Sequence, residues 1–270
     1  MSLVLITSAN NQFGGVLSTA YKQAGGPPFD FVIVLPEKTE RRFPSWAKGF
    51  VAYNLFGASG TLRLFRLEYG KIFTKNERAL GLDLPWIDSI SLPETKVIYV
   101  DSINSKEARD LMESLHPSLL ISVGSPQILK KHILATATMG AINIHNGKLP
   151  VYRGLFGTFW EVARGEPYGY VCVHRMVPQV DQGEVLAYAR FSLEHMASFL
   201  DLLIAKKRAG GRLLAQVVNH SRTAGQLEAQ CHDYPSHRFQ KEYFGWPSLE
   251  EIARFRWTHT KKLKNRSHVP

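Results

Sequence analysis

The chain has 270 residues, with 33 Lys and Arg against 23 Asp and Glu, which gives a formal net charge of +10 at pH 7. Hydrophobic residues make up 44% and charged residues 21%, so a mainly disordered chain is excluded. No run of about 20 apolar residues exists to span a membrane. The two cysteines, Cys172 and Cys231, are too few for a disulfide framework or a four-thiolate zinc site. With no signal-peptide pattern after Met1, we expect a reduced, cytoplasmic protein without a metal site.

The basic excess is concentrated near the C-terminus. Residues 206–270 hold 13 Lys and Arg against 5 Asp and Glu, which is +8 of the total, and five of the ten histidines. This asymmetry indicates an anionic partner near the C-terminal segment, with a solvated basic face as the alternative. Phosphates on a small substrate, an acidic membrane surface and RNA fit the charge equally well.

Strand and helix patterns alternate along most of the chain, which is typical of βαβ units. We expect strands at 3–7, 29–35, 96–100, 119–123, 140–144, 170–176 and 184–191. We expect helices after the glycine-bearing turn 8–15 and at 104–115, 127–134, 155–164 and 197–219. The predicted fold class is α/β, a Rossmann-like, doubly wound and mostly parallel sheet.

Two segments depart from this alternation. Residues 36–95 combine many aromatic and basic residues without a clean period, and we expect a mostly helical insertion. Its aromatic side chains are expected to pack onto the sheet; the alternatives are a membrane interface and a cover over a substrate pocket. Residues 221–270 are polar and rich in Pro and His. We therefore expect a catalytic domain over 1–220, which includes the insertion, and a basic C-terminal extension over 221–270.

Three residues form the strongest candidate for chemistry. Asn143 and His145 are two positions apart at the carboxyl end of a predicted strand, so their side chains leave on one face. Asp181 follows a later strand in an Asp-Gln-Gly turn and can reach the imidazole. The group combines a neutral donor, a titratable ring and a carboxylate that is expected to raise the pKa of the ring. Since no G-x-S-x-G sequence accompanies it, the predicted chemistry is non-covalent.

The loop after this strand carries a specific resemblance. The run Ile142-Asn143-Ile144-His145-Asn146-Gly147-Lys148-Leu149-Pro150-Val151-Tyr152-Arg153-Gly154 resembles the signature of the folate-dependent formyltransferases. Val173-His174-Arg175-Met176 with Asp181-Gln182-Gly183 resembles the second motif of that family at the family's separation. The resemblance is good over about 95–205 and loose over 1–35. It implies the formyltransferase fold and 10-formyltetrahydrofolate as the formyl donor.

The same resemblance implies roles for the residues. An acceptor amine attacks the formyl carbon, Asn143 and His145 donate hydrogen bonds to the oxyanion, and Asp181 assists proton transfer. The pteridine pocket is expected to be formed, largely through backbone groups, by Val123, Gly124, Ser125, Pro126, Gln127, Ile128, Val177 and Val180. His174 is expected to be structural.

Contacts to the acceptor are expected from Asn10, Lys148, Tyr152 and Arg153. Arg153 either binds an acceptor anion or anchors its loop. The turn that contains Asn10 corresponds to a phosphate-binding turn in one branch of the family, but it lacks that branch's glycine spacing. An ordinary strand–helix turn with a folate-side contact is the alternative there.

The acceptor is the least determined part of the prediction. The 65 residues after Ala205 are too few for the barrel-like RNA-binding domain of methionyl-tRNA formyltransferases. Tyr243-Phe244-Gly245-Trp246-Pro247-Ser248 resembles the tail of surface-polysaccharide formyltransferases. We expect a small phosphate-bearing amine, a nucleotide-linked or lipid-linked amino sugar, as the acceptor. Alternatives are an amino acid, ribotide or methionyl-tRNA amine, and a non-catalytic folate- or nucleotide-binding module. Nucleic acid is disfavoured as a partner, while peripheral membrane contact and a homodimer stay open.

Overall fold

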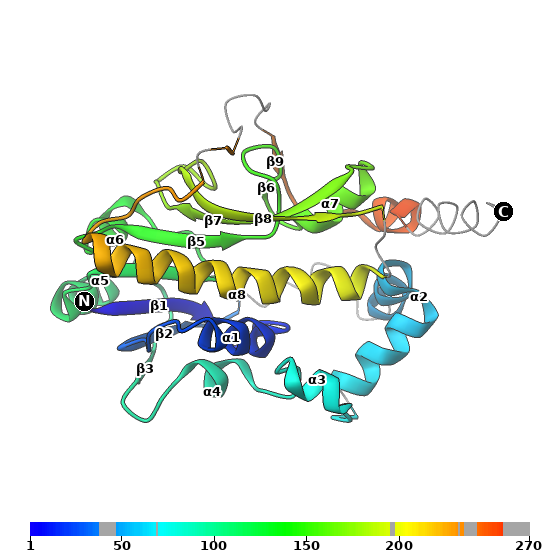
Figure 1. The fold of residues 1–270 in the computed structure, drawn as a ribbon, viewed down its shortest axis with the longest axis horizontal. Helices are drawn as coiled ribbons and strands as arrows, with labels where there is room; N and C mark the ends of the chain where they lie inside the picture. Colours follow the sequence, from blue (N-terminus) through cyan, green and yellow to red (C-terminus); the bar gives the residue numbers. More distant parts are fainter. Residues whose placement is uncertain (38–46, 69, 195–197, 232, 235–241, 256–270) are drawn as a thin grey trace.

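The computed structural model describes residues 1–37, 47–68, 70–194, 198–231, 233–234 and 242–255. Its centre is a seven-stranded sheet with the order β3-β2-β1-β4-β5-β7-β8 (Figure 1). The strands are β1 (Leu3–Ser8), β2 (Phe31–Leu35), β3 (Lys96–Tyr99), β4 (Leu119–Val123), β5 (Ala141–His145), β7 (Tyr168–Arg175) and β8 (Val185–Ser192). The five strands from β3 to β5 pair in parallel, whereas β7 and β8 add antiparallel to the β5 edge.

Helices cover both faces of the sheet because its inner strands are apolar on both sides. The helices are α1 (Gly14–Gln23), α2 (Ala47–Glu68), α3 (Lys75–Ala79), α4 (Trp86–Ile90), α5 (Lys106–Leu115), α6 (Lys131–Leu134), α7 (Gly157–Ala163) and α8 (Phe199–Ala224). Leu5 of β1 packs in a cluster with α1, α4 and α8, whereas its neighbour Ile6 packs in a cluster with α5 and α6. This alternation confirms the doubly wound, mostly parallel α/β fold.

The insertion forms α2, α3 and α4, as predicted for a helical segment. Trp86 of α4 packs into the core, and its indole N–H donates to the Thr7 hydroxyl at 2.9 Å. Only part of the aromatic packing expected for the rest is found: Phe56 packs beside α8, whereas Phe50 and Phe65 are 40% and 59% exposed. The reason is the position of α2, which runs along the N-terminal end of α8 rather than over the sheet (Figure 1).

The described part of the C-terminal segment packs against the catalytic fold. β9 (Tyr243–Phe244) pairs in parallel with β6 (Arg153–Gly154), which lies in the loop after β5. Farther along, Ile252 and Phe255 are buried against α7 and α8. The basic residues expected to dominate this extension lie largely in 256–270, outside the described residues. Within the described ranges, no helix is long and apolar enough to cross a membrane.

Candidate active site

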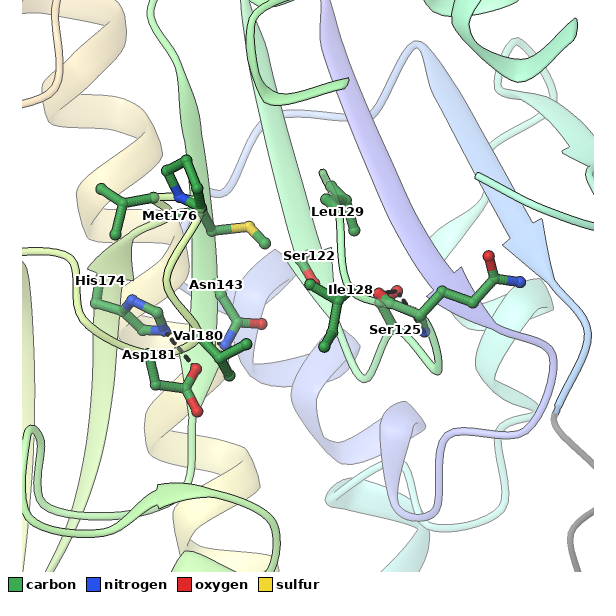
Figure 2. A pocket seen from close by; sticks show the side chains of 12 residues that line it. Ser122, Ser125, Ile128, Leu129, Asn143, His174, Met176, Val180 and Asp181 are labelled. Carbon is green, nitrogen blue, oxygen red and sulfur yellow. Dashed lines mark hydrogen bonds and ion pairs between the residues drawn. The ribbon is translucent and has the colours of Figure 1, made fainter. Parts of the chain in front are cut away.

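The carboxyl ends of β4 and β5 border a cavity of about 130 Å³, the position where open α/β sheets bind their ligands. Figure 2 shows Asn143, His174, Val180 and Asp181 on one side of it and Ser125 with Ile128 across from them. The full lining is Ser122, Ser125, Gln127, Ile128, Leu129, Asn143, His174, Met176, Val177, Pro178, Val180 and Asp181. Apolar walls with polar groups on both sides, and with an imidazole and a carboxylate together on one of them, suit a flat heterocycle that carries a reactive polar substituent.

Asn143 and His174 face each other across two neighbouring strands. They are direct partners in the antiparallel register of β5 and β7, so their side chains lie on the same face of the sheet. The Asn143 amide nitrogen is 3.1 Å from Nε2 of His174, and Nδ1 of His174 is 2.9 Å from the Arg175 carbonyl oxygen. The His174 side chain is 2% exposed. The sequence predicts only a structural role for His174, whereas the structure places it in the cavity wall.

Asp181 is held by the turn between β7 and β8. Its φ of 54° lies in the left-handed region, which Asp adopts more readily than most residues. Oδ2 accepts the Gly154 backbone N–H at 2.8 Å, and the carboxylate oxygens lie 3.5 Å from His145 Nδ1 and from His174 Nε2. Burial by itself raises the pKa of Asp181, but the two imidazoles and the Gly154 N–H outweigh it and bring the pKa to about 2. Asp181 is therefore a carboxylate at neutral pH.

His145 occupies the site beside Asp181 but does not line the cavity. Its Nε2 lies 2.6 Å from the Tyr152 carbonyl oxygen, which accepts the ring N–H, and its side chain is 8% exposed. The expectation that Asp181 raises the pKa of this ring is wrong in net effect. Burial lowers the pKa of His145 and outweighs the attraction of the Asp181 carboxylate. The neutral ring therefore has its N–H on Nε2.

Five of the eight residues predicted for the pteridine pocket line the cavity, namely Ser125, Gln127, Ile128, Val177 and Val180. The other three are absent from the lining. The Val123 carbonyl accepts the Thr7 hydroxyl at 2.6 Å, and Gly124 has a φ of 64° and lies against the Asn11 side chain. Pro126 does not line the cavity, although its neighbours in sequence, Ser125 and Gln127, do.

The residues predicted to contact an acceptor lie in different surroundings. Asn10 is exposed in the turn after β1, whereas Lys148 approaches Glu166, with Nζ 3.8 Å from its carboxylate. Tyr152 is 1% exposed and its hydroxyl donates to Glu166 at 2.8 Å, so its side chain offers no surface to a substrate. Arg153 has the loop-anchoring contact, since its Nε donates to the Glu242 carbonyl at 3.2 Å.

A buried ion pair and its hydrogen bonds connect the loop after β5 to α7 and α8. Lys206 Nζ of α8 lies 2.5 Å from Glu161 Oε2 of α7, and the two side chains are 1% and 0% exposed. The other Glu161 oxygen accepts the Lys148 N–H at 2.7 Å. Lys206 also donates to Thr158, whose hydroxyl donates to the Asn146 carbonyl. The sequence does not predict this network, because Lys206 stands in a run of basic residues typical of a solvated face.

A second lysine lies near the amino end of α1. Lys207 Nζ donates to the Asn11 side-chain oxygen at 2.7 Å, and burial lowers the pKa of Lys207 to about 8. The Asn11 amide nitrogen is buried without a hydrogen-bond partner among the described residues, and the first turn of α1 contains no acidic residue. A cation and an unsatisfied donor therefore meet at a helix N-terminus, a combination that suits an anion.

Comparison with known proteins identifies the class. Residues 91–218 match the family described as Formyl transferase. The chain is 29% identical to a methionyl-tRNA formyltransferase of Clostridium tetani over 154 residues, or 55% of this chain and 50% of the relative. It is 35% identical to that of Acidithiobacillus ferrooxidans over 123 residues, 46% of this chain and 39% of the relative. Residues 91–218 are thus similar to the formyl transferases, and the chain spans half or less of these curated relatives.

Solved structures agree on the fold. A phosphoribosylglycinamide formyltransferase from Bacillus halodurans superposes with a TM-score of 0.55 at 15% identity, covering 83% of this chain and 97% of that chain. A sugar N-formyltransferase from a Shewanella species gives 0.53 at 14% identity, covering 95% of this chain and 87% of the other. The doubly wound fold that the sequence predicts is thereby confirmed, and the match over residues 91–218 agrees with the predicted resemblance to formyltransferases.

Proposed function

We propose that the protein transfers a formyl group from 10-formyltetrahydrofolate to a primary amine. The observation that carries the proposal is the convergence of Asn143 and Asp181 on one cavity at the carboxyl ends of β4 and β5. The cavity offers apolar contacts for a pterin ring, and the polar groups on one wall lie where its formyl group would react. The similarity of residues 91–218 to the formyl transferases supports the same chemistry.

In the proposed reaction the acceptor nitrogen adds to the formyl carbon, and the carbonyl oxygen becomes an oxyanion. Asn143 donates its amide N–H to that oxygen from the cavity wall. His145 supplies the second donor once its Nε2 exchanges the Tyr152 carbonyl for the oxyanion. Asp181, ionised because its pKa is about 2, accepts the proton that the amine loses, directly or through a water, and passes it to the departing folate nitrogen. Breaking the bond to this nitrogen completes the transfer.

The acceptor is proposed to carry phosphate and to be a nucleotide-linked or lipid-linked amino sugar. Lys207 and Asn11 support the phosphate, since they present a cation and an unsatisfied amide donor at the amino end of α1. Asn11 lies against Gly124, and the next residue, Ser125, lines the cavity. An anion held there is therefore close enough to belong to the same substrate.

Methionyl-tRNA is the second candidate acceptor, favoured by the names of two of the relatives. A basic C-terminal segment also suits RNA. A non-catalytic binding module is the alternative from a different class.

Release of tetrahydrofolate from 10-formyltetrahydrofolate tests the proposal when it is measured against a panel of acceptors. The panel contains nucleotide-linked 3-amino and 4-amino sugars, glycinamide ribotide, methionyl-tRNA and free amino acids. Release with an amino-sugar nucleotide, reduced in Lys207→Met through a higher KM, is the expected result. Release only with methionyl-tRNA would overturn the acceptor assignment. Binding of folate without release for any acceptor, including lipid-linked amino sugars, would favour the binding module.

A further inference from the structure

His174 is a buried imidazole that the reaction scheme above leaves without a role. Its ring lies opposite Asn143 on the neighbouring strand and lines the same cavity (Figure 2). Two protein atoms lie within hydrogen-bond distance of the ring, the Arg175 carbonyl oxygen at 2.9 Å from Nδ1 and the Asn143 amide nitrogen at 3.1 Å from Nε2. Because the first of these is an acceptor and the second a donor, they require different states of the two ring nitrogens.

The hydrogen-bond pattern fixes the tautomer of the neutral ring. A carbonyl oxygen can only accept, so the single proton of neutral His174 lies on Nδ1 and is donated to Arg175. Nε2 then has a free electron pair, which accepts one of the two N–H groups of the Asn143 amide. The second Asn143 N–H remains for a ligand in the cavity. If the Asn143 amide were rotated by half a turn, its carbonyl oxygen would face the Nε2 electron pair, which is repulsive.

We propose that neutral His174 is a positioning residue that fixes the orientation of the Asn143 amide, so that Asn143 presents an N–H rather than its carbonyl oxygen to the formyl oxygen. The inference rests on the proposed formyl transfer. His174 acts through Asn143 and touches no reacting atom. An amide turned the wrong way would place its oxygen against the developing oxyanion, which removes a donor and adds a repulsion.

Two further side chains face the ring of His174. Asp181 has its Oδ1 3.5 Å from Nε2, and the His145 ring lies edge-on at 6.4 Å between centroids. The Asn143 amide nitrogen, at 3.1 Å, is therefore a nearer partner of Nε2 than the Asp181 carboxylate.

Two substitutions separate the two ring nitrogens. In His174→Gln the side-chain amide ends near the Nε2 position and its oxygen accepts from Asn143, whereas in His174→Asn it ends near Nδ1 and keeps only the bond to Arg175. We expect His174→Gln to retain kcat within about tenfold and His174→Asn to lose about 10²-fold, the scale of one lost oxyanion donor. KM for the folate should change little in either variant. His220→Gln, in an exposed His–Glu pair on α8, serves as the matched control.

Rescue by the conservative variant distinguishes positioning from a merely structural role. His220→Gln should keep the kcat of the wild type. Equal kcat in His174→Gln and His174→Asn would overturn the inference.

A spectroscopic measurement tests the arrangement without turnover. In protein labelled with ¹⁵N-histidine, long-range ¹H–¹⁵N spectra at pH 8 should show the His174 proton on Nδ1. A proton on Nε2 would overturn the inference even if the enzyme is active. A wild-type protein that releases no tetrahydrofolate would instead refute the proposed function, and the spectrum would still decide the tautomer.

Discussion

Substitutions at Lys206 and Glu161 test how each charge of this buried ion pair contributes to the stability of the fold. Lys206→Met leaves Oε2 of the buried Glu161 carboxylate without the ammonium, while Oε1 keeps its two backbone N–H donors. Glu161→Gln leaves the Lys206 ammonium without a counter-ion. The double variant removes both charges. The amide oxygen that Glu161→Gln introduces can still accept the N–H groups of Lys148 and Tyr170, which bond to one and the same Glu161 oxygen in the wild type.

The magnitude follows from the burial of the pair. Side chains that are 1% and 0% exposed have almost no access to water, so removing one partner should lower the free energy of unfolding by about 3–5 kcal/mol. The double variant should lose only about 1–3 kcal/mol, the cost of one unsatisfied amide N–H. Burial already raises the pKa of Glu161 in the wild type, and Lys206→Met removes the ammonium that counteracts this, so the pKa rises further. Stability is then lost as pH rises, and the deficit should shrink when pH is lowered from 8 to 5.

Urea unfolding followed by circular dichroism measures these differences. Arg109→Met is the matched control, because Arg109 and Glu113 form an exposed pair on α5 whose loss should leave the free energy of unfolding almost unchanged. A Lys206→Met variant with the stability of the Arg109→Met control would refute the reasoning. The same refutation would come from a double variant that is less stable than either single variant.

Three further predictions concern stability and the site. Lys207→Met should raise the free energy of unfolding at pH 7 by about 1–3 kcal/mol, since its pKa falls from 10.5 to about 8 in the fold. It should also abolish the rise in stability that the wild type shows as pH increases from 8 to 10.5, where only the unfolded chain holds the proton; urea titrations at several pH values measure both effects. Glu77→Gln should lower stability at pH 7 by about 2–3 kcal/mol. The stability difference between variant and wild type should vanish as pH falls from 4.5 toward 2, because two arginines outweigh burial and bring the pKa of Glu77 to about 2. A variant that loses stability at acidic pH as steeply as the wild type would contradict this. Gly154→Ala should cost about 1–3 kcal/mol and reduce kcat, because φ is 90° and a Cβ would lie 2.4 Å from the Phe244 carbonyl oxygen. Wild-type thermal stability in that variant would argue against the described loop.

Local patterns predicted most of the sheet. The apolar runs at 3–7 and 119–123 form β1 and β4. Both faces of a central parallel strand are buried, so such a strand is a continuous apolar run that the local sequence alone predicts. The two-residue spacing of Asn143 and His145 likewise predicts a shared face, and the structure confirms that both side chains approach Asp181 or its partner His174.

Other features depend on contacts that sequence spacing does not encode. The pairing of β6 with β9 joins Arg153 to Tyr243, and a two-residue strand has no periodic signal. His174 enters the cavity wall only because the β5–β7 register places it opposite Asn143. The net pKa of His145 depends on the balance between burial and the charge of Asp181, which no motif contains.

The central claim, that Asn143 stabilises the oxyanion of a formyl transfer, is tested most directly by Asn143→Ala. The measurement is the rate of tetrahydrofolate release from 10-formyltetrahydrofolate with the acceptor that the panel identifies. It is made beside calorimetric binding of 5-formyltetrahydrofolate, a folate that binds without transferring its formyl group. The expected result is a loss of about 10²–10³-fold in kcat with folate affinity retained. Wild-type kcat in Asn143→Ala would contradict it.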